Sequence, residues 1–361
     1  MIPYFVVFAA AIGLTFMGQK FYRSNKLVGW LFFGASILLL SLFAAVRDAS
    51  VGADLETYKV EYYNRSLNFQ NPMNFITKSG GEYLFFGFVY FCSHILGSFR
   101  AMLFIIEFLP LIALYYCTIK LDYKYMTFAL VAFLLMFFNS SLNVMRQVVA
   151  VAFTIVAFFQ AFNKRRLLAL ALIFAATLFH TSAIIMLVMF PTIYLARKEF
   201  RLKTYVFIVG VFCVFCLGVG FVTSHPEILP NFLQKYLAYT ETAHAFINIF
   251  FLTVKVAFLS FITFFYRFYK DDRLCRCLYL FAILDLLFYC FSGVVQFGYR
   301  LSYYFVVFYA FFIPVIYDKL PEKERALFKY GILTMLVGYW FSRNLAVGYD
   351  STIPYLLGEI S

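Results

Sequence analysis

The stretch RDASVGADLETY, residues 47–58, combines the residue types that bind phosphate and move protons. It begins at Arg47, directly after twenty nearly uncharged residues, and continues through a glycine-containing turn to Asp54 and Tyr58. The planar guanidinium of arginine binds phosphate through two parallel hydrogen bonds, and a carboxylate can take a proton from a hydroxyl group. The stretch therefore predicts a site for an anionic substrate at the edge of an apolar segment.

Further polar groups stand beside other apolar runs. Ionisable groups at membrane depth are functional candidates by default, and several arginines facing one outer cavity would suit a lipid pyrophosphate whose tail lies in the bilayer. These additional candidates are Glu82, Arg146, Gln147, His180, Arg300, Arg343 and Asp350.

Each candidate also has a structural interpretation. Arg47 can pair with Asp48 or extend to lipid headgroups, and Arg146 can cap a helix end. A single His180 can be a hydrogen-bonded residue between helices, and Asp54 can cap the helix that follows it. What favours a site is the expected convergence of all these groups on one side of the membrane.

The composition indicates which elements position these groups. The chain is 64% hydrophobic and 13% charged, with a mean hydropathy of +0.84, whereas soluble domains are about half apolar and about a quarter charged. Apolar runs of bilayer-spanning length recur from end to end. The predicted fold class is an all-α polytopic membrane protein, a single integral-membrane domain over 1–361. The net charge of +12 then reflects basic cytoplasmic loops rather than nucleic-acid binding.

The apolar pattern predicts about twelve transmembrane helices. The first lacks a basic segment before it, so a retained helix is expected rather than a signal peptide. The outer loops 47–100 and 223–246 are expected to contribute to the site. The predicted spans are residues 2–17, 27–46, 101–119, 125–140, 147–162, 167–180, 182–196, 204–222, 247–266, 277–296, 302–317 and 328–341.

The segment 83–97 decides the topology, because it is short for a span. If it does not cross, loops that hold 20 of the 30 basic residues share one side, which is then the cytoplasm. If it crosses, the count barely changes, but a wholly basic loop exchanges with the mixed-charge loop 47–82. Density of charge favours a surface or re-entrant helix, with both termini outside. The shared loops are 18–26, 120–124, 163–166, 197–203, 267–276 and 317–329.

Three ionisable residues, Glu107, Lys255 and Asp285, are expected within spans. Buried charges need partners, so Lys255 should pair with one of the two carboxylates. A structural pair is favoured over a proton-coupled one. The seven cysteines have no histidine or carboxylate cluster beside them, so they are interpreted as packing residues, and no metal or cofactor is expected.

The motif R-x₃-V-G-x-D-x₃-Y, from Arg47 to Tyr58, resembles a hallmark of the EpsG family of polysaccharide polymerases, which is related to the Wzy-type polymerases. Weaker matches follow in the same order, from about residue 40 to the end of the chain. They are Glu82 before an apolar segment, NVMRQVVAVAF with Arg146 and Gln147, FHTSAII with His180 and Ser182, YRLSYYF with Arg300, and a terminal IPYLL.

The resemblance implies a bacterial enzyme of the cytoplasmic membrane that joins oligosaccharide repeat units. The units are carried on undecaprenyl pyrophosphate at the outer face, and the products are O-antigen, capsule or exopolysaccharide. A GT-C-like fold with a surface helix after the first outer loop is implied as well, which supports the reading of 83–97 as non-crossing. A separate chain-length regulator is a possible partner.

Glycosyl transfer passes through an oxocarbenium-like state and releases a pyrophosphate. The arginines at 47, 146 and 300 are predicted to clamp that pyrophosphate, with Arg343 behind them and Asp48 beside the first. Asp54 ranks first as the general base, followed by His180 and then Glu82. Tyr58 and Gln147 are predicted to contact sugar.

Three other classes share the expected substrate. A transporter or flippase for the lipid-linked unit would show inverted repeats and broken helices, which the sequence does not reveal. An O-acyltransferase would alter decoration of the glycan and leave its chain length intact. A single-sugar glycosyltransferase of the GT-C type would use a lipid monophosphate donor instead.

Overall fold

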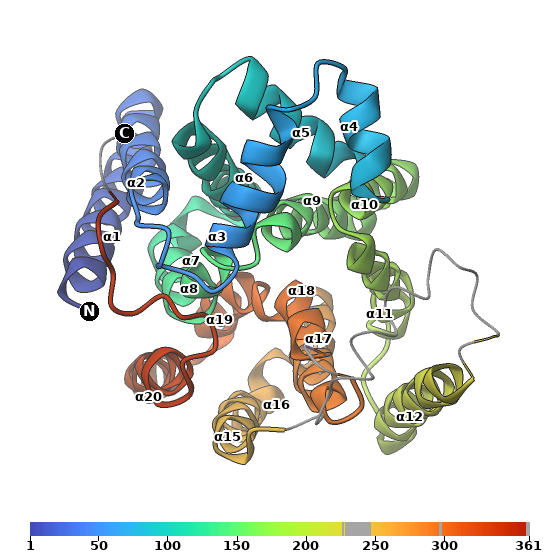
Figure 1. Ribbon diagram of the computed structural model, residues 1–361. Coiled ribbons are helices and arrows are strands. Elements are labelled where there is room, and N and C mark those ends of the chain that lie inside the picture. The colour runs from blue at the N-terminus through green and yellow to red at the C-terminus, as the bar shows by residue number, and fades with distance from the viewer. Residues whose placement is uncertain (226, 228–246, 296–297, 359–361) are drawn as a thin grey trace.

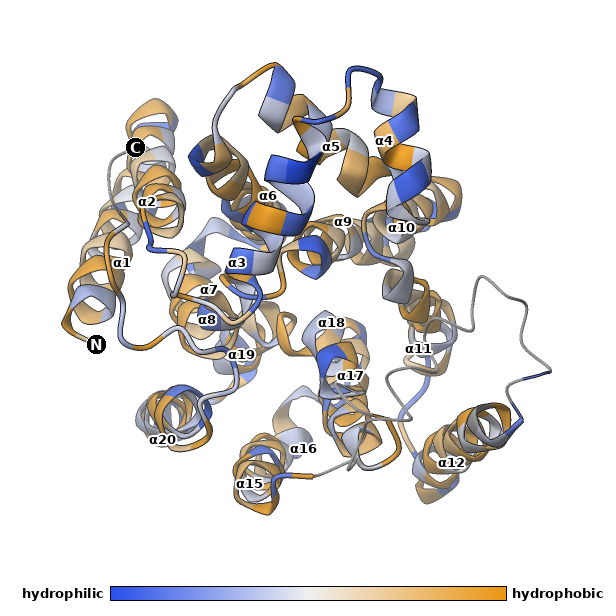
Figure 2. Cartoon of the chain, in the orientation of Figure 1, coloured by the Kyte–Doolittle hydropathy of each residue, from blue (hydrophilic) through white to orange (hydrophobic). Residues whose placement is uncertain are grey.

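The computed structural model describes residues 1–225, 227, 247–295 and 298–358, and these ranges are helical apart from turns, loops and one pair of bridged residues. Most helices are apolar over most of their surface (Figures 1 and 2). Seven helical runs within the described ranges are long and apolar enough to cross a membrane, and the protein is a multi-pass membrane protein. They are α1 (Ile2–Tyr22), α2 (Lys26–Ala45), α6 (Phe99–Leu121), the run Tyr123–Ser141 that contains α7 (Met126–Phe133) and α8 (Asn139–Ser141), α9 (Met145–Phe162), α12 (Leu202–Ser224) and the run Arg273–Gly293 that contains α17 (Arg273–Cys290).

The prediction of about twelve spans is wrong. The described chain has seven, or eight if Gly298–Val306, which contains α18 (Tyr303–Val306), and α19 (Tyr309–Lys319) form one broken span bent by 42°. The sequence counted segments that are too short, since a helix of fourteen residues spans only about 21 Å of a core about 30 Å thick. The remaining elements are α10 (Arg166–Phe179), the 3-10 segment Thr181–Val188 with α11 (Met189–Leu195), α15 (Ile249–Phe264), α16 (Tyr266–Tyr269) and α20 (Glu322–Phe341), whose first turns are charged.

The predicted sharing of one side is confirmed for five of the six basic loops by the contacts between them. The amide of Gln19 donates to the carbonyl of Lys124 at 2.8 Å, and Lys124 pairs with Asp318 at 3.0 Å. Lys319 pairs with Asp272 at 2.8 Å. Arg267 with Glu324 and Lys270 with Glu199 make two longer bridges. These contacts gather the loops at one end of the helices, which we call the basic end.

The segment that follows α2 stays at the opposite end. Its elements are α3 (Leu55–Thr57), the π-helical segment Tyr58–Asn64, α4 (Pro72–Ser79) and α5 (Tyr83–His94). Arg47, just after α2, donates to the carbonyl of Leu142 at 2.8 Å, and Arg100, in the first turn of α6, donates to the carbonyl of Gly358 at 3.2 Å. The chain thus enters and leaves this segment at one end, and α5, with twelve residues, does not carry it across.

The C-terminal segment of the chain, residues 351–358, holds the segment after α2 in place through main-chain hydrogen bonds. Arg47 and Leu357 form an antiparallel bridge, in which the Asp48 amide donates to the Leu356 carbonyl and the Gly358 amide donates to the Val46 carbonyl, both at 2.9 Å. The Gly52 amide donates to the Ser351 carbonyl at 3.0 Å. The terminal IPYLL match therefore has a structural role, because it pairs with the start of the RDASVGADLETY stretch.

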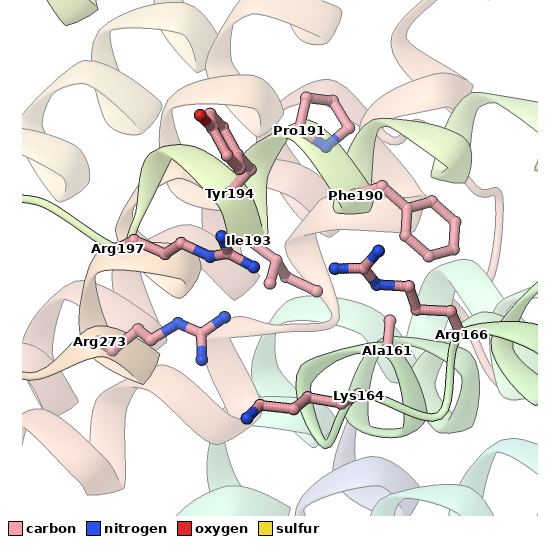
Figure 3. Close-up of a pocket in the computed structure, with 9 residues that line it drawn as sticks. All are labelled: Ala161, Lys164, Arg166, Phe190, Pro191, Ile193, Tyr194, Arg197 and Arg273. Carbon is pink, nitrogen blue, oxygen red and sulfur yellow. The ribbon is translucent and has the colours of Figure 1, made fainter.

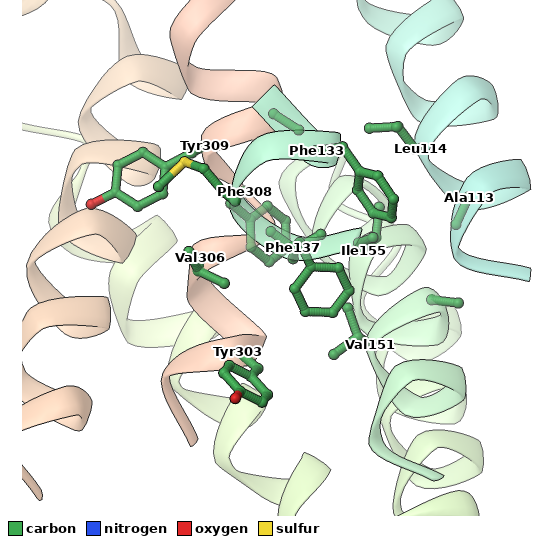
Figure 4. Packing of buried hydrophobic residues seen from close by; sticks show 14 of the residues in the cluster. Ala113, Leu114, Phe133, Phe137, Val151, Ile155, Tyr303, Val306, Phe308 and Tyr309 are labelled. Carbon is green, nitrogen blue, oxygen red and sulfur yellow. The ribbon is translucent and has the colours of Figure 1, made fainter. Parts of the chain in front are cut away.

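Part of the hydrophobic core lies between α6, α7, α9 and the bent pair (Figure 4). Phe158 on α9 packs against Phe308 with ring centroids 5.1 Å apart, and Phe159 packs against Phe311 at 4.9 Å. Edge-on aromatic pairs of this kind stabilise beyond the area that they bury. They hold α9 against the bent pair and so bring Arg146 and Arg300, at the start of each element, to the same end.

The seven cysteines are free, and four of them are buried, which fits their interpretation as packing residues. Within the described ranges, no three histidine, cysteine, aspartate or glutamate residues converge closely enough to hold a metal ion.

The predicted buried pair is formed by Lys255 on α15 and Asp285 on α17. The ammonium nitrogen lies 2.7 Å from each carboxylate oxygen, and both side chains are buried. Three aromatic rings, of Phe251, Tyr289 and Tyr339, surround the lysine. Glu107 lies elsewhere, where it accepts a hydrogen bond from Ser141.

We expect Lys255→Met to reduce the free energy of unfolding by about 3–5 kcal/mol, because it leaves a buried carboxylate without its charge partner. The double variant Lys255→Met/Asp285→Leu should recover most of that loss. Thermal unfolding of the purified variants in detergent measures both effects. Wild-type stability of the single variant together with loss of activity would instead give the pair a functional role.

Lys164, in the turn between α9 and α10, has a left-handed backbone with a φ of 66°. Glycine is the usual residue at this position after a helix, and a side chain there costs about 1 kcal/mol. Lys164→Gly should therefore raise the melting temperature by a few degrees, measured in detergent against the wild-type chain. An unchanged or lower melting temperature would mean that the side chain compensates through its contacts.

Candidate functional site

Glu82, at the start of α5, connects two of the predicted site residues. Its Oε2 lies 2.6 Å from Nη1 of Arg146, and its Oε1 lies 2.7 Å from Nδ1 of His180. The Thr181 amide also donates to Oε1, at 3.3 Å. Burial alone would raise the pKa of this carboxyl, but the hydrogen bond with His180 and the charge of Arg146 outweigh it and lower the pKa to about 2. Glu82 is therefore ionised at any physiological pH.

Arg146 is held in a fixed orientation at the first turn of α9. Its Nε donates to the hydroxyl of Tyr58 at 3.2 Å, and its guanidinium lies over the rings of Tyr62 and Phe85 at 5.4 and 5.9 Å. Its side chain is still 27% exposed, whereas that of Glu82 is only 6% exposed. A cation fixed by aromatic rings and a carboxylate, yet reachable from outside, suits an incoming anion.

Asp54 and Arg300 form a second pair, 3.2 Å between Oδ2 and Nη2, in which both side chains are about 30% exposed. The Asp54 side chain makes no capping hydrogen bond to α3, so its interpretation as a helix cap does not hold. Instead, the backbone amide of Asp54 donates a hydrogen bond to the side-chain oxygen of Asn143 at 2.9 Å. This pair presents a second guanidinium at the same end of the helices.

The two pairs belong to one connected group. Gln147, next to Arg146, donates its side-chain amide to the carbonyl of Arg300 at 2.6 Å. The hydroxyls of Ser182 and Tyr304 lie 3.1 Å apart and join the segment after His180 to the start of the bent pair. In sum, the structure brings together seven predicted residues, which we call the acidic–basic cluster: Asp54, Tyr58, Glu82, Arg146, Gln147, His180 and Arg300.

Arg47 contacts main chain rather than the cluster. It is buried, and its guanidinium donates to the carbonyls of Ala44 and Leu142. The same Leu142 carbonyl lies where a side chain on Gly52 would point, 3.1 Å from an added Cβ, and Gly52 has a φ of 109°. Arg47 and Gly52 thus lock the motif loop against the chain before α9, which positions Asp54.

The two remaining predicted binding residues lie outside the cluster. Arg343, in the segment after α20, is buried and bonds Asp350 at 3.0 Å and the hydroxyl of Tyr303. Because Tyr303 follows Arg300 by one turn, this pair supports the cluster from behind. Asp48 is partly exposed, and hydrogen bonds from the hydroxyl and the backbone amide of Ser50 lower its pKa.

Sequence reasoning missed Asn143 and the rings that hold Arg146. A polar stretch between the apolar runs 128–138 and 148–159 was the available signal for Asn143. No local pattern marks Tyr62 or Phe85, because each reaches Arg146 only through the fold. The predicted contribution of the loop 223–246 lies outside the described residues, apart from 223–225 and 227.

The cluster can bind an anion and transfer a proton. Two partly exposed guanidinium groups supply charge and paired donors for phosphate. His180 uses Nδ1 toward Glu82, an arrangement that orients the ring and directs Nε2 away from that carboxylate.

Comparison with known proteins supports the motif assignment made from the sequence. No curated protein and no solved structure matches the chain, so the GT-C-like architecture stays a prediction. The family model for EpsG matches residues 30–357. The match includes the whole acidic–basic cluster and residues 351–357 of the C-terminal segment, which pairs with the start of the motif at residues 47–58. The chain therefore belongs to the EpsG family, whose members are membrane proteins implicated in exopolysaccharide biosynthesis.

Proposed function

We propose that this protein is a glycosyltransferase that polymerises oligosaccharide repeat units carried on undecaprenyl pyrophosphate. The observation that carries the proposal is the ion-pair arrangement of Glu82 with Arg146 and His180, next to the pair of Asp54 and Arg300. It combines charge for a pyrophosphate with a base for a sugar hydroxyl at one membrane surface.

In the proposed reaction, a hydroxyl oxygen of the incoming unit forms a bond to the anomeric carbon of the growing chain. The bond from that carbon to the pyrophosphate oxygen breaks, and undecaprenyl pyrophosphate leaves with the electron pair. The hydroxyl proton passes to Nε2 of His180, which Glu82 orients, or to Asp54. Arg146 and Arg300 neutralise the charge that develops on the leaving group.

We assign the cluster to the outer face of the bacterial cytoplasmic membrane. The basic end would then face the cytoplasm, as the bias of Lys and Arg toward cytoplasmic loops favours, and both termini would lie outside. Lipid-linked repeat units are the proposed substrate, and a separate chain-length regulator is a proposed partner.

One observation favours a second candidate, a flippase for the same lipid-linked unit. The two parts of the bent pair meet at 42° at the break between Val306 and Tyr309, about two turns after Arg300, and broken helices are typical of transporters. Against it, the Lys255–Asp285 pair is closed and buried, whereas the acidic–basic cluster is reachable from one end.

Deletion of the gene followed by electrophoresis of the surface glycan tests the proposal. A polymerase predicts that a ladder of chain lengths collapses to single repeat units, which accumulate on the outer leaflet. Total loss of the glycan, with units retained on the inner leaflet, would assign the protein to transport. An unchanged ladder with altered decoration would instead indicate an O-acyltransferase.

A further inference from the structure

A basic cavity of about 600 Å³ lies at the end of the helices opposite to the acidic–basic cluster. It opens between the α9–α10 turn, α11 and the start of α17 (Figure 3). Arg146 and Lys164 stand at the two ends of α9, which has 18 residues and is about 27 Å long. The cavity is therefore separate from the proposed catalytic site.

Four cations line this cavity: Lys164, Arg166, Arg197 and Arg273. Figure 3 shows the guanidinium groups of Arg166 and Arg197 pointing toward one another across it. No acidic residue lines it, and none of the four cations makes a salt bridge to a carboxylate in the part of the chain that the structure describes. Like charges held together in this way repel one another unless an anion enters.

Two carboxylates that lie close in sequence to the cavity arginines are bound elsewhere. Asp272, beside Arg273, pairs with Lys319 at 2.8 Å and accepts from the Cys275 amide. Glu199, two residues after Arg197, pairs with Lys270 at 3.3 Å. The charge of the cavity is thus not balanced from within this part of the chain.

Two of the arginines are positioned by aromatic rings. The guanidinium of Arg273 lies 4.9 Å from the ring of Phe162, and its Nε is buried without a hydrogen-bond partner. The guanidinium of Arg197 lies 5.2 Å from the ring of Tyr194. A buried donor without a partner costs free energy, so Arg273 is poised to bind an anionic ligand, to which its guanidinium can donate.

An apolar groove adjoins the cavity and shares Pro191 with it. The groove runs between α11, α12 and α17, and Val188, Phe212 and Phe288 are among its walls. The helix α12 stands at the edge of the molecule (Figure 1) and no residue in its most apolar stretch is buried. The two spaces therefore suit one lipid molecule, with its phosphate in the basic cavity and an acyl chain in the groove.

We propose that this cavity binds the phosphate headgroup of an anionic phospholipid, whose acyl chain lies in the adjoining groove. The shared chemistry is a phosphate anion, and the groove favours a lipid over free phosphate as its source. Basic pockets between transmembrane helices on the cytoplasmic side bind anionic headgroups in this manner. The left-handed backbone at Lys164 places a lysine at the cavity where glycine would relieve strain, which fits a ligand-binding role.

The test measures binding to the purified full-length protein by native mass spectrometry and by titration. The probes are phosphatidylglycerol, phosphatidylcholine and inorganic phosphate. We expect phosphatidylglycerol to bind in preference to phosphatidylcholine, and inorganic phosphate to bind weakly. The variant Arg166→Gln/Arg197→Gln should weaken the binding of phosphatidylglycerol about thirtyfold, because each basic group contributes about a factor of five to the affinity.

A matched control removes the same charge at the same end of the helices. Arg23→Gln/Lys26→Gln lies in the exposed α1–α2 turn and should leave lipid binding unchanged. Lys164→Gly should weaken binding while the protein stays at least as stable, which excludes misfolding as the cause. Equal binding of both lipids, an equal effect of the control pair, or tighter binding of inorganic phosphate than of phosphatidylglycerol would each overturn the proposal.

Discussion

Replacing Glu82 by glutamine should lower polymer synthesis by about two to four orders of magnitude, although the side chain keeps its size. Glutamine removes the negative charge that pairs with Arg146 at 2.6 Å, and it no longer orients His180 as an anion does. The side-chain NH2 group of glutamine would also have to face either Arg146 or His180, and neither a cation nor a donor can accept its hydrogen bond. The measurement is the chain-length ladder of a deletion strain that carries the variant.

The control is Glu61→Gln, which changes an exposed glutamate in the same segment between α2 and α6 and should leave the ladder intact. Both variants are compared for expression level and for melting temperature in detergent. A Glu82→Gln protein that folds and still makes full-length polymer would remove the cluster from the mechanism. If the Glu82→Gln variant fails to fold, Arg146→Lys tests the cluster in its place, because lysine keeps the positive charge but lacks the planar fork of donors that binds phosphate.

The composition of the site could be predicted because its residues interrupt apolar runs. An ionisable residue stands at the edge of each of four such runs: Glu82, Arg146, His180 and Arg300. Ionisable groups at membrane depth cost free energy, so each of them is a candidate functional residue. The distribution of basic loops predicted that these loops share one end of the helices, and the contact of Lys124 with Asp318 agrees with that prediction.

The role of Arg47 could not be predicted in the same way. An arginine at the end of a span can face a ligand or bond main-chain carbonyls, and only the fold decides between them. Here the carbonyl of Leu142, 95 residues away, and the bridge to Leu357 determine its environment. Local sequence contains no information on either partner, so a structural arginine was interpreted as a binding one.

The number of spans was overestimated for a related reason. Apolar runs such as 167–180 and 182–196 have the composition of a span but not its length. The two runs meet at His180, where α10 ends at Phe179 and a 3-10 segment begins at Thr181. That break places the histidine beside Glu82, so the feature that misled the count of spans also builds the site.

Asp54→Asn and His180→Gln should separate the two candidate bases. We expect His180→Gln to lower kcat by about a hundredfold or more with little change in KM, since it removes the proton acceptor. Asp54→Asn should keep most of kcat and lower KM for the lipid-linked unit, because it releases Arg300 from a competing carboxylate 3.2 Å away. Repeat units extracted from the deletion strain are the substrate.

The reverse result would assign the proton transfer to Asp54 and leave His180 as a positioning residue. Asp54 belongs to the stretch whose sequence resembles a hallmark of the family, whereas His180 has the geometry of an oriented base, with Nδ1 at 2.7 Å from Glu82. Arg300→Lys is the informative third variant. If Asp54 serves to hold Arg300, then Arg300→Lys should raise KM and largely cancel the effect of Asp54→Asn on KM. If Asp54 is the base, the two variants should lower kcat/KM independently, and their free-energy effects should add.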